Sequence, residues 1–409
     1  MSVISGSTPA YRDGVAEAPR GERGGADRVM DAGPTTTPAA PAAHPLSAAR
    51  LRVCLISSSF YGWGHYSGPG RVTRMLGREL ARRGARVTAI VPRRHGQREV
   101  EQVDGITVLG YPAGSPWHAL RLSRECDADI YHSQGPTLAT LLAAAARPRR
   151  RHVITLRDAP SLRELGRSVR ALIPDRARDV LPVLRDEHPL RWLGAVPANA
   201  VYCSAEELVA LARARLHRRT AGFLPAPVSV PRRVQKSRVP TVCFLGSWAP
   251  HRHPERVLAL AARFPSVRII AIGRSPDRAH DLELRRAFAR YANLHAPGAV
   301  NQFRSDALSQ TLSESWVLVS TGGGRGLPDA CVEGAAHGCA ILSDADPDAF
   351  ATRFGHHAAT GDLAAGLEAL LAGDAWRELG ARGHAHVLAT FDAEVALRRH
   401  LDAYGEVLA

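Results

Sequence analysis

Leu51-Arg52-Val53-Cys54-Leu55-Ile56 is a short apolar run, and it predicts a buried strand of a parallel sheet. A loop rich in glycine follows, and apolar residues then recur at helical spacing from Val72 to Leu80 before Gly84 ends the helix. Residues 87–91 form a second apolar run. This order of strand, loop, helix and strand is typical of an α/β fold with a parallel sheet.

The same order recurs along the chain and predicts two doubly wound, Rossmann-like domains. The segment 224–231 is rich in proline and can form neither a helix nor a central strand, so it predicts an extended linker. We expect a disordered leader over 1–49, a first domain over 50–224, a hinge over 225–239, a second domain over 240–390 and a last segment over 391–409. Further strands are predicted at 87–91, 106–109, 130–132, 152–156, 201–204, 241–245, 267–272, 316–320 and 339–343. Helices are predicted at 138–146, 205–216, 254–264, 282–291 and 329–337.

The chain has 409 residues and a net charge of +14, which raises the question of nucleic-acid binding. Nearly all of the positive charge is arginine, because Lys236 is the only lysine. The arginines are spread along the chain, and the densest groups are 147–151 and 217–219. Scattered cations offer no continuous track to a phosphate backbone, so solvated surfaces are favoured over nucleic-acid binding.

Other features of the composition exclude several classes of protein. Six cysteines are scattered without a C-x-x-C pair, so neither a zinc site nor a disulfide framework is expected. No run of about eighteen uncharged apolar residues occurs, so no spanning helix is predicted. Residues 1–49 lack the basic start and apolar core of an export signal. We therefore expect a cytoplasmic protein.

Three loops at the predicted carboxyl ends of strands are candidates for ligand contact. The first is 68–71, for which a plain tight turn is an equally good interpretation. The second is 246–252, where Arg252 could hold a phosphate, although a solvated arginine is favoured when the loop is taken alone. The third is 321–328, whose four glycines cost backbone entropy that a close ligand contact would explain. Glu333, on the helix that follows, could accept hydrogen bonds from a sugar diol.

Gly326-Leu327-Pro328 and, five residues after the proline, Glu333-Gly334-Ala335 resemble the signature of the family-4 retaining glycosyltransferases, which have the GT-B fold. The resemblance extends over most of residues 51–405. Residues 130–133 and 154–158 are similar to two strands that face the cleft in that family, and 224–231 is similar to its hinge. Residues 376–408 resemble its C-terminal helix, which crosses back to the first domain.

The resemblance implies that a sugar is transferred from a UDP- or GDP-sugar with retention of configuration and without a metal or another cofactor. The reaction would be a front-face displacement, and the acceptor would be a small molecule, a glycan or a lipid-linked compound. Glu333 would bind the ribose hydroxyls and Gly70 would approach the diphosphate. Arg252 would neutralise the leaving group. The catalytic residues would be Arg252, Arg325 and Arg157, and His132 and Asp158 would face the acceptor. The residues that bind the donor would be Gly68, Gly70, Ser247, Gly322, Gly323, Gly324, Gly326, Leu327, Pro328 and Glu333.

The sequence departs from the family pattern at three positions. Arg325 stands where the family has a first glutamate, Ser247 where it has an arginine, and Arg157 where it often has a histidine. A guanidinium only donates hydrogen bonds, so it cannot replace a carboxylate without changing what is recognised. Our hypothesis is that Arg325 takes over the missing cationic role and that the donor sugar is held differently, as an unusual or acidic sugar would be.

These departures leave other functions open. A degenerate, non-catalytic protein that binds sugar nucleotides or serves as a partner subunit is the main alternative. A sugar-phosphate epimerase on the same fold is less favoured, because the carboxylates that such enzymes use cannot be located. Residues 162–172 are amphipathic and basic and could rest on an anionic membrane, although a helix packed on its own domain is the favoured interpretation.

Overall fold

The structure is a computed structural model that describes residues 48–63, 67–94, 96–157, 195–216, 222–322, 324 and 326–409. All of them belong to one compact unit, His44–Ala409. Residues 1–47 of the predicted leader, the segment 162–172 and the arginine group 217–219 lie outside the described residues. Residues 48 and 49, placed in the leader by the sequence, belong to a 3-10 helix, Ala48–Arg50. The division of residues 50–409 into domains stays a prediction.

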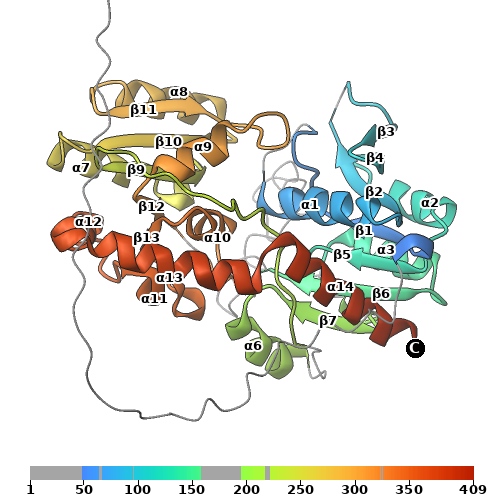
Figure 1. Cartoon of the computed structure of the whole chain (residues 1–409). Helices are drawn as coiled ribbons and strands as arrows, with labels where there is room; N and C mark the ends of the chain where they lie inside the picture. The colour runs from blue at the N-terminus through green and yellow to red at the C-terminus, as the bar shows by residue number, and fades with distance from the viewer. Residues whose placement is uncertain are drawn as a thin grey trace, which may run out of the picture. The chain divides into compact units, whose positions relative to one another are not determined.

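The first sheet has its strands between residues 52 and 223. They are β1 (Arg52–Ile56), β2 (Arg86–Arg93), β3 (Val100–Val103), β4 (Ile106–Pro112), β5 (Ile130–Ser133), β6 (Arg151–Leu156), β7 (Ala200–Cys203) and β8 (Gly222–Phe223). Their order across the sheet is β3-β4-β2-β1-β5-β6-β7-β8 (Figure 1). The pair β3 and β4 is antiparallel and the other pairs are parallel. Parallel pairing aligns the carboxyl ends of most strands along one edge, where ligands bind in such sheets.

The second sheet is parallel throughout. Its strands are β9 (Thr241–Ser247), β10 (Arg268–Arg274), β11 (Leu294–Gly298), β12 (Val317–Ser320), β13 (Ala340–Ser343) and β14 (Gly355–His357). They are ordered β11-β10-β9-β12-β13-β14. The strands β12 and β13 and the first four residues of β9 are buried and mostly apolar, as expected for a sheet covered on both faces.

Helices connect the strands and cover both sheets. Around the first sheet they are α1 (Gly68–Arg82), α2 (His118–Glu125), α3 (Leu138–Ala146) and α6 (Glu206–Leu216). The helices that alternate with the strands of the second sheet or follow its last strand are α7 (Arg256–Arg263), α8 (Arg278–Phe288), α9 (Ala307–Glu314), α10 (Asp329–Ala336), α11 (Phe350–Phe354), α12 (Leu363–Leu371) and α13 (Ala375–Thr390). The chain ends in α14 (Ala393–Leu408).

Every strand and helix predicted above is present, with shifted ends, and two details are wrong. The short strand β8 lies between residues 201–204 and the linker and has no counterpart among the predicted strands. The helix predicted over 282–291 is α8, which begins at Arg278 because the side chain of Asp277 accepts a hydrogen bond from the backbone N–H of His280 at 2.8 Å. The linker 224–231 contains no helix or strand, as predicted.

The helix α14 packs against the layer of the first sheet. Leu397, Leu401 and Tyr404 share one buried cluster with Leu76 and Leu80 of α1. The backbone N–H of Val228 in the linker donates to the carbonyl of Phe391 at 2.9 Å, just before the helix begins. The crossing back of the C-terminal helix is therefore confirmed.

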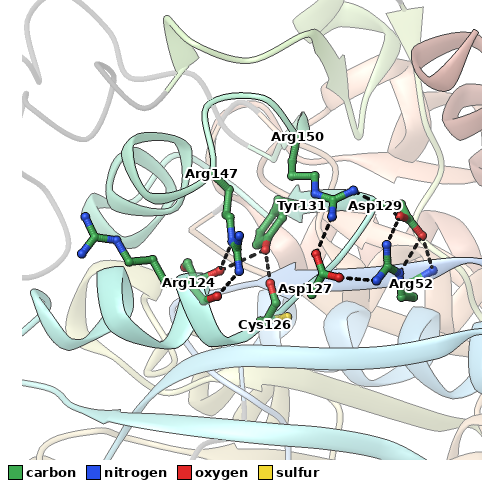
Figure 2. A network of polar contacts seen from close by, with 9 residues as sticks. Arg52, Arg124, Cys126, Asp127, Asp129, Tyr131, Arg147 and Arg150 are labelled. Carbon is green, nitrogen blue, oxygen red and sulfur yellow. Dashed lines mark hydrogen bonds and ion pairs between the residues drawn. The ribbon is translucent and has the colours of Figure 1, made fainter.

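Two arginines of the group 147–151, Arg147 and Arg150, take part in polar contacts at the amino-terminal edge of the first sheet (Figure 2). Arg52 pairs with Asp127 and Asp129, and Nη2 of Arg150 lies 2.5 Å from Oδ1 of Asp127. Arg147 donates to carbonyls of the last turn of α2. These cations neutralise carboxylates and a helix C-terminus, which supports the interpretation of this group as an ordinary protein surface.

All six cysteines are buried and free. In the described part of the chain, no helix is long and apolar enough to cross a membrane. The described residues also include no group of three or more His, Cys, Asp or Glu side chains that could hold a metal ion.

Candidate functional site

The amino-terminal ends of α1 and α10 meet in the structure. Each helix follows the carboxyl end of a strand, β1 in the first sheet and β12 in the second. The carboxylate of Asp329, the first residue of α10, lies so close to Gly68 that a Cβ at that position would collide with it. The glycine at this position therefore leaves room for the carboxylate of Asp329 at the start of α1.

Four charged side chains form what we call the charged cluster: Arg71, Arg157, Asp329 and Glu333. Nη2 of Arg157 donates to Oδ1 of Asp329 at 2.5 Å. Nη2 of Arg71 lies 3.5 Å from the same oxygen, and its Nη1 lies 3.1 Å from Oε1 of Glu333. Arg71 comes from the first turn of α1 and Arg157 directly follows β6, so two cations from the first sheet's layer meet two carboxylates of α10.

The charged cluster is largely shielded from solvent, with the side chains of Arg157 and Asp329 13% and 17% exposed, yet its guanidinium groups have few aligned hydrogen bonds. Arg71 is 4% exposed and Glu333 is 7% exposed. Among the described residues, none accepts a hydrogen bond from Nε, Nη1 or Nη2 of Arg71 or from Nη1 of Arg157. Buried donors without acceptors are costly, so this is where the chain would gain most from a ligand with acceptor oxygens.

Burial and charge change the pKa values within the cluster. Burial raises the pKa of Glu333, although Arg71 opposes this rise. Burial lowers the pKa of Arg157, although Asp329 counteracts it. For Arg71 the effect of burial is outweighed by Glu333 and Asp329, and its pKa is raised. The cluster therefore balances two cations against two carboxylates away from water.

A cavity of about 220 Å³ adjoins the charged cluster. Its lining includes Arg71 and Arg78 of α1, Val228 of the linker, Gln302 and Phe303 before α9, and Glu333 of α10. Glu333 thus faces both a cation and a space with polar walls. This combination suits a ligand that carries hydroxyl groups beside an anionic group.

Arg252 and the glycine loop after β12 are locked together. Nη1 of Arg252 donates to the carbonyl of Gly322 at 2.6 Å, and the hydroxyl of Thr321 donates to the carbonyl of Arg252. Gly322 has a φ of +62°, and a Cβ there would collide with the backbone of Arg252. The backbone N–H of Gly322 also donates to Asp344 at 3.0 Å. Packing therefore explains the glycine at 322, where the sequence suggested a ligand contact.

The other predicted donor-site residues lie at the same edges. Gly70 packs against Ser59 and the backbone of Tyr61, and Ser247 ends β9. Gly326 and Leu327 are buried, and Pro328 precedes the first turn of α10. Gly324 is exposed. Gly323, Arg325 and Asp158 lie outside the described residues.

His132 lies away from the cavity. It is fully buried, and its ring nitrogens are hydrogen-bonded to the hydroxyl groups of Tyr404 and Thr155, each at 2.8 Å. Burial holds the pKa of His132 well below its usual value. A ring with both nitrogens occupied beneath α14 has no group left for an acceptor, so we do not assign it to the acceptor side.

The sequence singled out Glu333 and Arg157, which the structure places in the charged cluster, but it did not predict the contacts of Arg71. The motif 68–71 ends in this arginine, and its position in the first turn of a helix after a glycine loop was the available signal. A second missed contact joins the two sheet layers: the hydroxyl of Tyr61 donates to the carbonyl of Val300 at 2.8 Å, and its ring packs on Phe303. Only the tertiary structure reveals such pairs.

Comparison with known sequences gives one partial match. Residues 66–187, less than half of the chain, match the family model described as Glycosyltransferase Family 4. This segment contains Gly68, Arg71 and Arg157. None of the curated proteins matches the chain.

Solved structures of glycosyltransferases resemble the whole described fold. Sucrose-phosphate synthase from Thermosynechococcus elongatus is 18% identical with a TM-score of 0.67, and the alignment covers 88% of this chain and 99% of that one. HepE from Anabaena, in complex with UDP-glucose, is 14% identical with a TM-score of 0.61, over 87% and 100% of the two chains. WaaG, a glycosyltransferase of lipopolysaccharide biosynthesis, is 13% identical with a TM-score of 0.60, over 86% and 99%. The chain therefore has the fold of the GT-B glycosyltransferases, with two parallel-sheet, Rossmann-like layers and a helical C-terminus.

Proposed function

We propose that this protein is a glycosyltransferase that uses a nucleoside diphosphate sugar, a UDP- or GDP-sugar, as donor. The observation that carries the proposal is the position of Glu333, which lines the cavity beside two buried arginines on a GT-B fold. A carboxylate accepts hydrogen bonds from a ribose diol, and guanidinium groups bind phosphate oxygens. HepE, which shares this fold, is described with UDP-glucose bound.

We further propose that the sugar is transferred with retention of configuration and without a metal. The bond between the anomeric carbon and the diphosphate oxygen breaks while the acceptor hydroxyl attacks from the same face, and the departing phosphate takes the proton of that hydroxyl. Cationic side chains near the diphosphate would stabilise its growing negative charge. Arg252, at the loop after β9, is our candidate for this role. The acceptor would be a small molecule, a glycan or a lipid-linked compound.

A thermal-shift panel tests donor binding. The full chain is heated with UDP-glucose, other UDP-, GDP- and ADP-sugars, and the free nucleotides. A ligand that binds only the folded state adds about 2–3 kcal/mol of stability at a hundred times its Kd. We expect at least one nucleotide sugar to raise the melting temperature. If none of them does, the proposed function is wrong.

Turnover then separates an enzyme from a non-catalytic binder, the main alternative. With the donor that binds, nucleotide release is measured in the presence of candidate acceptors. We expect Arg252→Ala to lower kcat roughly 100-fold while donor affinity changes little, since loss of one charge-stabilising donor has about this effect. The control is Arg286→Ala on the exposed face of α8, which removes the same charge. Donor binding without release in the wild type would favour the non-catalytic protein.

A further inference from the structure

A hydrogen-bonded pair of a serine and a histidine lines the cavity beside the charged cluster. Ser309 lies on α9, and His337 directly follows the last residue of α10. Oγ of Ser309 and Nε2 of His337 are 2.9 Å apart, and both residues belong to the lining of the cavity. Neither residue is part of the charged cluster, so the pair is a separate polar feature of the same space.

The other ring nitrogen of His337 determines where the proton of Ser309 points. Nδ1 of His337 lies 2.8 Å from the backbone carbonyl oxygen of Glu333, one turn earlier in α10. A carbonyl oxygen only accepts hydrogen bonds, so Nδ1 carries a proton. The ring is neutral, because burial lowers the pKa of His337 to about 4. A neutral imidazole has one N–H group, so Nε2 is the acceptor and the hydroxyl of Ser309 donates to it.

The histidine is held firmly in this orientation. Its backbone N–H donates to the carbonyl of Gly334 at 3.1 Å, and its own carbonyl accepts from Nζ of Lys236 at 2.7 Å. The residue is 6% exposed. Because the backbone and Nδ1 are both anchored, Nε2 stays directed at Ser309.

Ser309 therefore presents its oxygen to the cavity as an acceptor. A hydroxyl has one proton and two lone pairs, and the proton of Ser309 is already donated to His337. A serine inside a helix can donate to a carbonyl one turn earlier, but here the ring takes that proton instead. Glu333, paired with Arg71 at 3.1 Å, adds a carboxylate to the same lining. The cavity thus offers acceptor oxygens from two helices.

We propose that Ser309, oriented by His337, is a specificity-determining residue of the donor site, whose hydroxyl oxygen accepts a hydrogen bond from a hydroxyl or N–H group of the bound nucleoside. The proposal rests on the proposed function, because the nucleoside would belong to the donor of that reaction. A ligand with an acceptor atom at this point meets the lone pairs of Ser309 and is disfavoured, since no proton is left to bridge them. The pair selects ligands by the direction of one hydrogen bond.

A serine hydrogen-bonded to a histidine is also the arrangement of a nucleophile and its base. A general base is most effective when its pKa lies near the pH of the reaction. The pKa of His337, about 4, is too low for that. The pair is therefore suited to binding and not to nucleophilic catalysis.

Calorimetric titration of the full chain with UDP or GDP, whichever raises the melting temperature more, tests the role of Ser309. We expect Ser309→Ala to weaken binding about 3- to 10-fold, because one hydrogen bond between neutral groups is lost. Ser313→Ala, one turn further along α9 and not among the described residues that line the cavity, is the matched control and should bind like the wild type. If Ser309→Ala does not fold, Ser309→Cys replaces it, because a thiol fills similar space and is a weak acceptor.

Three analogues of the same nucleotide identify the group that Ser309 recognises. They are the 2′-deoxy form, the 3′-deoxy form and the form methylated at the N–H of the base ring. We expect one analogue to bind the wild type about 3- to 10-fold more weakly than the parent nucleotide, and this difference to vanish in Ser309→Ala. A deoxy analogue assigns the partner to the ribose, and the methylated analogue assigns it to the base.

Two variants of the histidine test its positioning role with the same analogues. His337→Phe removes the acceptor of the Ser309 proton, and we expect it to lose the preference for the parent nucleotide. His337→Gln supplies an amide oxygen that can accept this proton, and we expect it to keep the preference. Equal preference in the two variants would overturn the positioning role of His337.

Two results would overturn the role of Ser309. One is equal affinity of the wild type and Ser309→Ala for the parent nucleotide. The other is that every analogue is weakened by the same factor in both proteins, as a purely structural serine would give. Either result in a wild type that binds the nucleotide refutes this inference alone. A wild type that binds no nucleotide and no nucleotide sugar refutes the proposed function and this inference with it.

Discussion

At the scale of single residues, the arginines of this chain differ in their surroundings, and those of the charged cluster contact carboxylates away from solvent. Arg71 and Arg157 are buried beside carboxylates, whereas Arg147 and Arg150 hold together the edge of the sheet. Removing one partner from a buried ion pair leaves an uncompensated charge. The cluster therefore joins two helices, and several of its guanidinium N–H groups have no acceptor among the described residues.

Sequence reasoning singled out Glu333 and Arg252 from the loops and the helix that carry them, and their roles stay predictions. It named Arg71 only as the end of the loop 68–71, because the partners of this arginine come from a helix more than 250 residues away. The donor role of Gly322 stays a prediction, while its positive φ and its close contact with the backbone of Arg252 give a packing reason for a glycine there. Local sequence gives residue type and spacing, while the partner of a side chain depends on contacts across the fold.

Buried histidines make the stability of the chain depend on pH. Burial lowers the pKa of His337 and of His400 to about 4. The unfolded chain takes up these protons near pH 6.5, so the stabilising effect is complete above pH 6.5 and is lost as the pH falls toward 4. We expect thermal denaturation to show a loss on the order of 3 kcal/mol per histidine over this range.

The variant His400→Gln keeps a neutral side chain that can donate to the carbonyl of Ala396, as the ring does at 2.8 Å. We expect it to make the pH dependence of the melting temperature less steep. His118→Gln, on an exposed helix start, is the control and should leave the slope unchanged. An equal slope in His400→Gln and the wild type would contradict a neutral, buried His400.

At the scale of elements, the only lysine of the chain, Lys236, binds the linker to the carboxyl ends of two helices. Nζ of Lys236 donates to the carbonyls of Ser315 at 2.5 Å and of His337 at 2.7 Å, at the carboxyl ends of α9 and α10. A cation at two helix C-termini satisfies carbonyls that have no partner within their helices. The residues after the proline-rich segment are thus anchored to the second sheet's layer.

Replacing this lysine tests the anchor. We expect Lys236→Met, which keeps the length of the side chain, to lower the free energy of unfolding by about 2–3 kcal/mol, since hydrogen bonds from a charged group are lost. Urea denaturation measures the change. Arg233→Met, at an exposed position in the same segment, is the control. If Lys236→Met lowers the free energy of unfolding no more than Arg233→Met does, the hydrogen bonds of Lys236 do not stabilise the fold.

The regular elements were the best predicted part of the fold, and the reason is local. Buried parallel strands are continuous apolar runs, and glycine or proline marks their ends. The antiparallel strand β3 was missed because its exposed and half-buried residues show no apolar run. The first turn of α8 was missed because its start depends on the side chain of Asp277 and not on apolar spacing.

At the scale of the whole molecule, the net charge of +14 does not arise at the charged cluster, where two cations face two carboxylates. At the sheet edge of Figure 2, Arg52 and Arg150 are likewise paired with Asp127 and Asp129. Two layers of parallel sheet each bring a loop and a helix start to the same place, which is why a GT-B fold can build one site from distant residues. The order of strands and helices predicted this architecture, but the pairing of Arg71 with Glu333 depends on how the layers meet.

The central claim is that Glu333 binds the nucleoside of a sugar donor, and calorimetric titration of that donor tests it most directly. The donor is the nucleotide sugar that raises the melting temperature most in the panel. We expect the wild type and Glu378→Gln, an exposed control on α13, to bind it equally, and Glu333→Gln to bind it about 10- to 100-fold more weakly. Undiminished affinity in a folded Glu333→Gln protein would contradict the account.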